Sequence, residues 1–156
     1  MEPSKKDYSK ENITGRSLLM NMFRTNTYAE YLPTNLSLTL DEMNELHVQM
    51  LKGISEDEDA IELYQTLLLQ ALRYFQFRVN WAVWDYEEKK SKDESRTSCH
   101  NALIANFNIL ARYMKSLGFS TEWRDSLGDE TDDPCARKRI GDFACYLVFV
   151  NAINER

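Results

Sequence analysis

The chain has 156 residues, 43% of them hydrophobic and 28% charged, and its 19 basic and 25 acidic side chains give a net charge of −6. These totals fit one domain that buries roughly two thirds of its unfolded surface, so we predict a single helical domain over residues 13–156, after a flexible polar arm at residues 1–12. The negative charge opposes non-specific attraction to nucleic acid or anionic membranes, so direct nucleic-acid binding is not expected.

Residues 17–23, Ser-Leu-Leu-Met-Asn-Met-Phe, could form a short amphipathic helix. The next helix has a clearer beginning, because Thr39 and Glu42 have the spacing of a capping box. We expect it to end at Gly53, which would supply a left-handed exit. A second capping box at Ser55 and Glu58 then predicts a new helix after a very short turn, which implies antiparallel or sharply crossed helices.

The longest predicted helix spans Glu56 to Lys92, a segment without glycine or proline. At about 100° per residue, its apolar side chains fall on two faces. One face holds Ile61, Tyr64, Leu68, Leu72, Phe75, Val79, Ala82 and Tyr86, and the other holds Leu63, Leu67, Tyr74, Phe77, Trp81 and Trp84. Such a helix lies either at the centre of a bundle or against a second subunit, and the pattern leaves both open.

The charge run Glu87–Glu94 indicates an exposed helix end or a hinge. A further helix is predicted from near Ser95 to Gly118, a short helical turn around 121–127, and a last helix from Ala136 to about Asn154. Residues 143–150 are apolar all round, which would also suit a strand, but no partner strand is evident. The predicted fold class is therefore all-α: a bundle of four main helices around one long central helix, plus one or two short helices.

The cysteines Cys99, Cys135 and Cys145 are an odd, scattered set without a Cys-x-x-Cys pair. The N-terminus lacks an apolar signal segment, and no run approaches the roughly 18 apolar residues that cross a bilayer. We therefore predict reduced thiols in a cytoplasmic protein without a membrane contact.

Metal and cofactor patterns are missing from the sequence. Bundle di-iron proteins use Glu-x-x-His pairs, but His47 and His100 are preceded at that spacing by Asn44 and Thr97. The glycine-rich loops that cradle phosphates are also absent. We expect no metal and no cofactor, and we assign no catalytic residue.

Charged side chains on apolar segments are the stronger signal. Arg78 and Asp85 are seven residues apart between the two apolar faces, and Asp142 lies beside the last apolar segment. Desolvated charges need partners, so these residues either form ion pairs between helices or, with His100, build a polar pocket. The second apolar face offers a different candidate, because it is either buried core or an aromatic interface anchor; its members are Tyr74, Phe77, Trp81 and Trp84.

Three segments of the C-terminal third resemble a known family. They are Ser98-Cys-His-Asn-Ala through Arg112, Trp123-Arg-x-x-Leu-Gly, and Arg137-Lys-Arg-Ile-Gly-Asp-Phe-Ala144. They are similar to small proteins of unknown function carried on conjugative and phage-like mobile elements of Gram-positive bacteria. The family has no assigned activity, so the resemblance implies only a bacterial, cytoplasmic accessory protein.

Three functional hypotheses follow. The first is a non-enzymatic helical interaction protein, for which a homodimer through Trp81 and Trp84 is one form. The second is an acidic inhibitor of a DNA-handling enzyme that presents carboxylates in place of phosphates, because residues 25–70 carry nine acidic and one basic side chain. The third is an enzyme or small-ligand binder with a polar pocket around His100.

Overall fold

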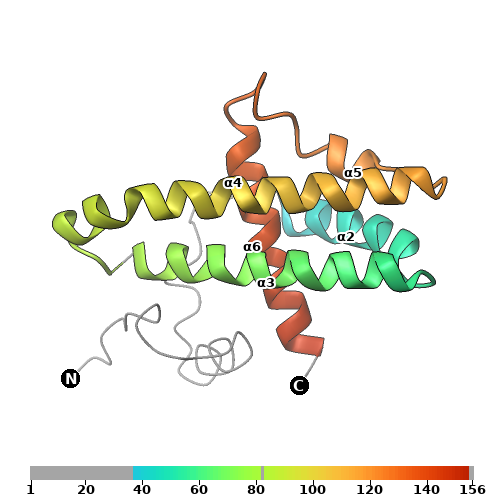
Figure 1. Ribbon diagram of the computed structural model, residues 1–156, viewed down its shortest axis with the longest axis horizontal. Coiled ribbons are helices and arrows are strands. Elements are labelled where there is room, and N and C mark those ends of the chain that lie inside the picture. Colours follow the sequence, from blue (N-terminus) through green and yellow to red (C-terminus); the bar gives the residue numbers. More distant parts are fainter. Residues whose placement is uncertain (1–36, 82, 155–156) are drawn as a thin grey trace.

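A computed structural model describes residues 37–81 and 83–154 and shows them as helices joined by short turns (Figure 1). The helices are α2 (Leu40–Ile54), α3 (Glu58–Trp81), α4 (Tyr86–Ser116), α5 (Glu122–Asp125) and α6 (Ala136–Asn154). The described residues contain no strand, so the predicted all-α class is confirmed, and residues 143–150 are helical. The arm predicted at residues 1–12 and the helix predicted at residues 17–23 lie outside the described residues.

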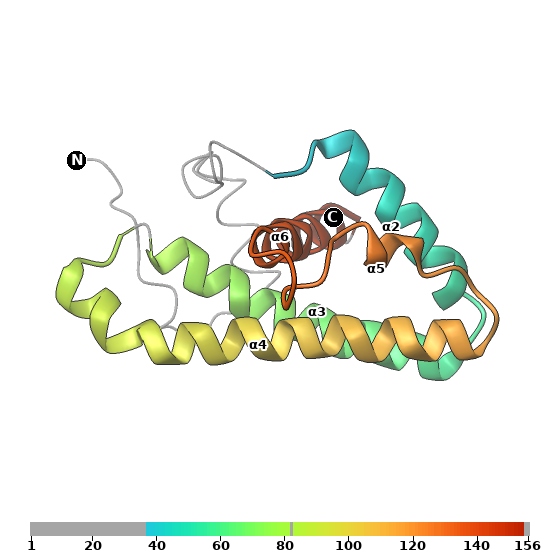
Figure 2. The same ribbon diagram turned by 90° about the horizontal axis from the view of Figure 1, so that it is seen from above.

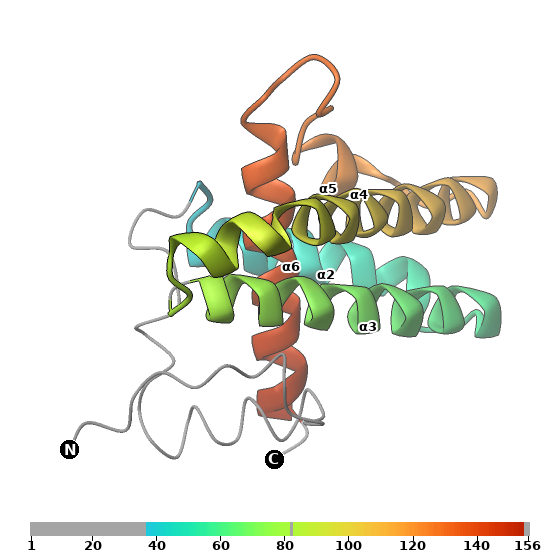
Figure 3. The same ribbon diagram turned by 60° about the vertical axis from the view of Figure 1, so that its left-hand side comes forward.

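The two longest helices, α3 and α4, run antiparallel and side by side, and α6 crosses the pair steeply (Figure 1). Seen from above, α2 and α5 lie on the same side of this pair as α6 (Figure 2). Figure 3 shows the crossing from a third direction, with the last turns of α6 extending past α3. This arrangement differs from the predicted one, in which four helices surround the segment from Glu56 to Lys92.

The helix with the most complete burial is α6. Its fully buried side chains are Ala136, Ile140, Phe143, Ala144 and Leu147. A helix with so many buried side chains must be covered by neighbours, and α6 packs mainly against α3. Helix α3, which lies within the predicted central segment 56–92, packs against α4, α6 and α2, but that segment is divided between α3 and α4 and does not form one helix.

The predicted long helix is interrupted between Trp81 and Asp85. Helix α3 ends at Trp81, the backbone N–H of Trp84 donates to the carbonyl of Asn80 at 2.9 Å, and α4 begins at Tyr86. Asp85 is the N-cap of α4, because its side chain accepts from the N–H of Glu88 at 2.8 Å. The charge run Glu87–Glu94 thus forms the first turns of α4, where its leading acids favour the positive end of the helix dipole.

Breaking the helix here lets one chain cover its own apolar surface. Helix α3 buries a single stripe, which combines residues from both predicted faces: Ala60, Tyr64, Leu67, Ala71, Tyr74, Phe75 and Val79. Away from this stripe Leu69 is 67% exposed and Ile61 is 36% exposed. The prediction of two buried faces on this helix is therefore wrong.

Local capping signals are partly confirmed. Thr39 Oγ1 accepts from the N–H of Glu42 and a Glu42 carboxylate oxygen accepts from the N–H of Thr39, both at 3.0 Å, so the first capping box is present. The second box predicted at Ser55 is wrong. Asp57 caps α3 instead, accepting from the N–H of Ala60 at 2.9 Å.

Two glycines have different roles. Gly118 follows α4, where the sequence predicts the end of that helix, and its φ of +90° is a left-handed conformation typical of helix ends. Gly53 lies inside α2 without a positive φ, so its predicted role as a helix exit is wrong. A Cβ atom at Gly53 would lie 3.3 Å from Cγ of Phe119 and would also meet the side chain of Met114, so this glycine permits close approach of the segment after α4.

None of the described helices combines the length and the apolar character that crossing a membrane requires. The three cysteines are unpaired: Cys99 and Cys145 are buried and Cys135 is exposed. This agrees with the prediction of reduced thiols.

Candidate functional site

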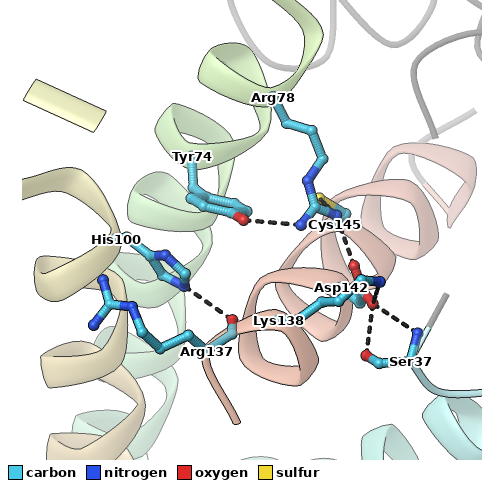
Figure 4. Close-up of polar contacts among 8 residues, drawn as sticks. All are labelled: Ser37, Tyr74, Arg78, His100, Arg137, Lys138, Asp142 and Cys145. Atoms are coloured by element: carbon cyan, nitrogen blue, oxygen red, sulfur yellow. Dashed lines mark hydrogen bonds and ion pairs between the residues drawn. The ribbon is translucent and has the colours of Figure 1, made fainter. Parts of the chain in front are cut away.

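The centre of the candidate site is the carboxylate of Asp142, which lies on α6 and is 1% exposed. One oxygen, Oδ2, accepts from the N–H and the hydroxyl of Ser37, at 2.9 and 2.6 Å, and from Nζ of Lys138 at 3.1 Å. The other, Oδ1, accepts from Nη1 of Arg78 at 2.9 Å (Figure 4). The carboxylate therefore fastens α3 and the segment before α2 to α6.

The surroundings of Asp142 explain how a buried carboxylate stays ionised. Burial by itself would raise its pKa, but the two Ser37 hydrogen bonds and the charges of Arg78 and Lys138 outweigh burial and hold the pKa below its ordinary value. The predicted buried ion pair between Arg78 and Asp142 is present in the structure.

Arg78 extends the cluster along α3. Its Nη2 donates to the hydroxyl of Tyr74 at 2.8 Å, its Nη1 contacts Sγ of Cys145 at 3.4 Å, and its guanidinium carbon lies 5.1 Å from the centre of the Tyr74 ring. The crossing of α3 and α6 is close at this point. A Cβ atom at Gly141 would meet the Tyr74 hydroxyl and lie 2.9 Å from its Cζ, so only a glycine fits here without displacement.

His100, from α4, is next to this cluster rather than inside it. Its ring centre is 4.9 Å from that of Tyr74, and its Nε2 lies 3.0 Å from the carbonyl oxygen of Arg137. A carbonyl only accepts, so Nε2 carries the proton in this contact. Burial, reinforced by the positive charge of Arg137, lowers the pKa of His100 to about 4, which keeps the ring neutral at pH 7.

The fourth predicted charge, Asp85, is not part of the site. It is exposed and caps α4, beyond the end of α3. Asp85 was assigned to the site because the predicted helix continued past Trp81. In such a continuous helix, Asp85 and Arg78 would lie on the same side. The structure therefore brings together Arg78 and Asp142, with His100 alongside, and separates Asp85 from them.

Sequence reasoning also missed two partners of Asp142. Lys138 is four residues before it on a helix that was predicted, so the i, i+4 rule could have found this pair. Ser37 is 105 residues away in sequence and lies outside any helix, so no sequence pattern points to it.

The sequence left open whether its four selected aromatic residues belong to the core or to an interface, and the structure buries them to different extents. Tyr74 and Trp84 are buried, at 7% and 8% exposure, whereas Phe77 and Trp81 are half-buried. The Trp84 ring centre lies 6.2 Å from that of Trp81, and the Arg96 guanidinium of α4 lies 4.9 Å from the Trp81 ring. These contacts join α3 to α4 near the turn between them.

The cluster holds no activated nucleophile among the described residues. Burial raises the pKa of the Cys145 thiol to about 11 and also raises that of Cys99, so both stay protonated at neutral pH. The described residues also contain no group of three or more histidine, cysteine or carboxylate side chains placed to hold a metal ion. What the arrangement does chemically is to hold three segments together through charge-assisted hydrogen bonds.

The acidic block of residues 25–70 is divided in space. Its described members lie in two groups at the two ends of α2, a helix of 15 residues that is about 22 Å long by the usual 1.5 Å rise. One group is Asp41, Glu42 and Glu45; the other is Glu56, Asp57, Glu58, Asp59 and Glu62. Carboxylates grouped at opposite ends of α2 do not form the continuous ridge that a mimic of nucleic-acid phosphates would present.

Comparisons with protein-family models, with curated proteins and with solved structures found no match. The resemblance of the C-terminal third to mobile-element proteins stays a prediction.

Proposed function

We propose that this protein is a non-enzymatic interaction protein, and that its interaction surface is the α3–α6 face. We define this face by Leu68, Leu69 and Leu72 of α3 and by Phe149 and Val150 of α6. The observation that carries the proposal is the exposure of Leu69, 67% of whose surface faces solvent beside half-buried neighbours.

The two helices meet beside Leu68 and Leu72. Phe75, which follows them at helical spacing along α3 and is fully buried, packs edge-on against Phe149 of α6 at 5.3 Å between ring centres. Beyond this contact the last turns of α6 extend past α3 (Figure 1). Apolar side chains that stay in contact with water in this way gain free energy when a second surface covers them.

The first partner we propose for this face is a second copy of the chain. The exposed side of α3 begins with the acids Glu58, Asp59 and Glu62, and it carries the exposed Arg73 in its second half. A twofold axis near Leu69 would pair the acidic start of one α3 with the basic half of the other. This charge arrangement supports self-association. A homodimer through Trp81 and Trp84 has less support, because Trp84 is buried within its own chain and the half-buried Trp81 ring is in contact with Arg96.

Two further considerations favour binding over catalysis. The polar groups of the candidate site are engaged with one another, and neither buried thiol has a lowered pKa. The resemblance of the C-terminal third adds the proposal of a bacterial, cytoplasmic accessory protein.

Sedimentation velocity over a wide concentration range tests the proposal. The wild-type protein is expected to form dimers with increasing concentration, and Leu69→Glu is expected to remain monomeric because it buries a charge at the proposed contact. Ile109→Glu is the matched control, since Ile109 is 46% exposed on α4, away from this face. A wild-type protein that is monomeric throughout, or equal effects of the two variants, would contradict the proposal.

A further inference from the structure

A second feature of the molecule, independent of the proposed self-association, is a pocket of about 340 Å³ between α3 and α4. We call it the arginine pocket; it is lined by Tyr74, Phe77, Arg78, Trp81 and Arg96. Among the described residues this lining contains two arginines, three aromatic rings and no acidic side chain, although the chain as a whole has a net charge of −6. Positive charge concentrated at one pocket of an acidic protein favours the binding of an anion there.

Arg96 has hydrogen-bonding capacity that the described residues do not use. Its Nη2 donates to Asp93 at 3.1 Å and its guanidinium lies 4.9 Å from the centre of the Trp81 ring, but its buried Nε has no acceptor. The Nε atom is covered, so the donors open to a ligand oxygen are the Nη groups of this side chain, which is 37% exposed. The planar guanidinium suits carboxylate and phosphate groups, which it binds through parallel hydrogen bonds.

Arg78 adds the second guanidinium of the pocket. It is held in place by Asp142, which accepts from its Nη1 at 2.9 Å, and by the Tyr74 hydroxyl, which accepts from its Nη2 at 2.8 Å. Lys89 adds a further cation 5.9 Å from the centre of the Trp81 ring. Three described cations, Arg78, Arg96 and Lys89, therefore lie at or beside the pocket.

The aromatic side chains of the pocket indicate which kind of chemical group carries the anion. Trp81 and Phe77 are both half-buried, so each ring retains surface beside the pocket. Flat rings beside an arginine favour a planar ligand that stacks while its charged group meets the guanidinium. A volume of about 340 Å³ is of the size that a small molecule fills.

We propose that the arginine pocket binds a small organic anion in which a phosphate or carboxylate group is carried on a planar aromatic ring. The oxyanion lies between Arg78 and Arg96, and the ring packs against Trp81 and Phe77. Phosphate and carboxylate share the chemistry that the two arginines recognise, so the test has an arm for each.

The experiment is isothermal titration calorimetry of the full-length protein with two aromatic anions, adenosine monophosphate and 2-naphthoate. Adenosine, inorganic phosphate and acetate serve as the corresponding half-ligands. At least one of the two anions is expected to bind about tenfold or more tightly than its own halves, because the ring and the oxyanion contribute together. The arm that binds identifies the anionic group.

Arg96→Gln is expected to weaken that binding by about tenfold or more, since it removes the charge and the guanidinium donors that a ligand oxyanion would meet. Arg112→Gln is the matched control, because Arg112 is an exposed arginine of α4 outside the pocket lining. Trp81→Leu should also weaken binding of the aromatic anion while leaving inorganic phosphate unaffected. Circular dichroism of each variant checks that the helices are retained.

Three results would overturn the proposal: no binding of either aromatic anion at millimolar concentration, binding that Arg96→Gln and Arg112→Gln reduce equally, or binding of each half-ligand as tight as that of the whole. A glutamate-rich peptide that binds when neither aromatic anion does would also overturn it, in favour of an acidic protein partner.

Discussion

Replacing Asp142 with asparagine removes the negative charge from the buried cluster while keeping the size of the side chain. Arg78, whose side chain is 18% exposed, then loses its counter-charge. The NH2 group of the asparagine takes the place of one carboxylate oxygen, so it faces a donor from Ser37, Lys138 or Arg78. Removing one partner of a buried pair costs roughly 3–5 kcal/mol. Lys138 is 45% exposed and can turn to solvent, so we expect the lower end, a loss of about 3 kcal/mol in the free energy of unfolding.

A double-mutant cycle measures the interaction free energy between Arg78 and Asp142 separately from their other contacts. Arg78→Gln alone leaves the carboxylate with Ser37 and Lys138. The double variant is expected to be less destabilised than the sum of the two single variants, because the second substitution removes the charge that the first left uncompensated.

Urea denaturation followed by far-ultraviolet circular dichroism measures these losses. Asp93→Asn is the control, since Asp93 pairs with Arg96 on the surface and is 61% exposed. Such an exposed pair contributes less than about 1 kcal/mol. Asp142→Asn with a loss no larger than that of Asp93→Asn would show that the cluster does not hold α6 in place, and the reasoning would be refuted.

Acid should destabilise the fold before the carboxylates titrate, because the pKa of His100 is lowered from 6.5 to about 4. The unfolded chain binds this proton first, so stability falls as pH decreases from 6.5 to about 4, by about 3 kcal/mol for this group. His47, whose pKa is also lowered by burial, adds to this loss of stability. The urea midpoint of His100→Gln should therefore fall less with decreasing pH than the midpoint of the wild type. Equal slopes of midpoint against pH would argue against the assignment. Gly141→Ala should cost about 1–3 kcal/mol because its Cβ meets the held Tyr74 ring, whereas Gly53→Ala should cost less because its nearest neighbour is the flexible end of a methionine. Thermal unfolding compares the two, and a larger loss at Gly53 would contradict the crossing geometry.

The sequence contained enough local information for most helix positions. The capping box at Thr39, the glycine at 118 and the uniformly apolar segment 143–150 each indicated an element that the structure contains. These signals depend on neighbouring residues, so they can be interpreted without knowledge of the fold.

The errors concern competition between local signals and tertiary packing. Periodicity favoured one helix through Trp84, but Asp85 has the side chain and position of an N-cap, and turning the chain there buries the apolar stripe of α3 against α4. The steep crossing of α6 over α3 likewise follows from how helices pack, which a pattern along one helix does not encode.

The candidate site was predictable where burial of charge was the signal. Arg78 and Asp142 are charged residues on otherwise apolar helix surfaces, and they pair as expected. Arg96 was not singled out, because a charged residue in a polar segment of α4 has no distinguishing pattern until the fold brings it to Trp81.

Native-state amide hydrogen exchange tests the burial of α6 and its attachment through Asp142 most directly. The account predicts that the backbone amides of residues 140–148 in α6 are the slowest to exchange among the described helices, because these residues are the most completely buried and are tied by Asp142 to α3 and to Ser37. Exchange in this segment that is faster than in residues 64–75 of α3 would contradict it.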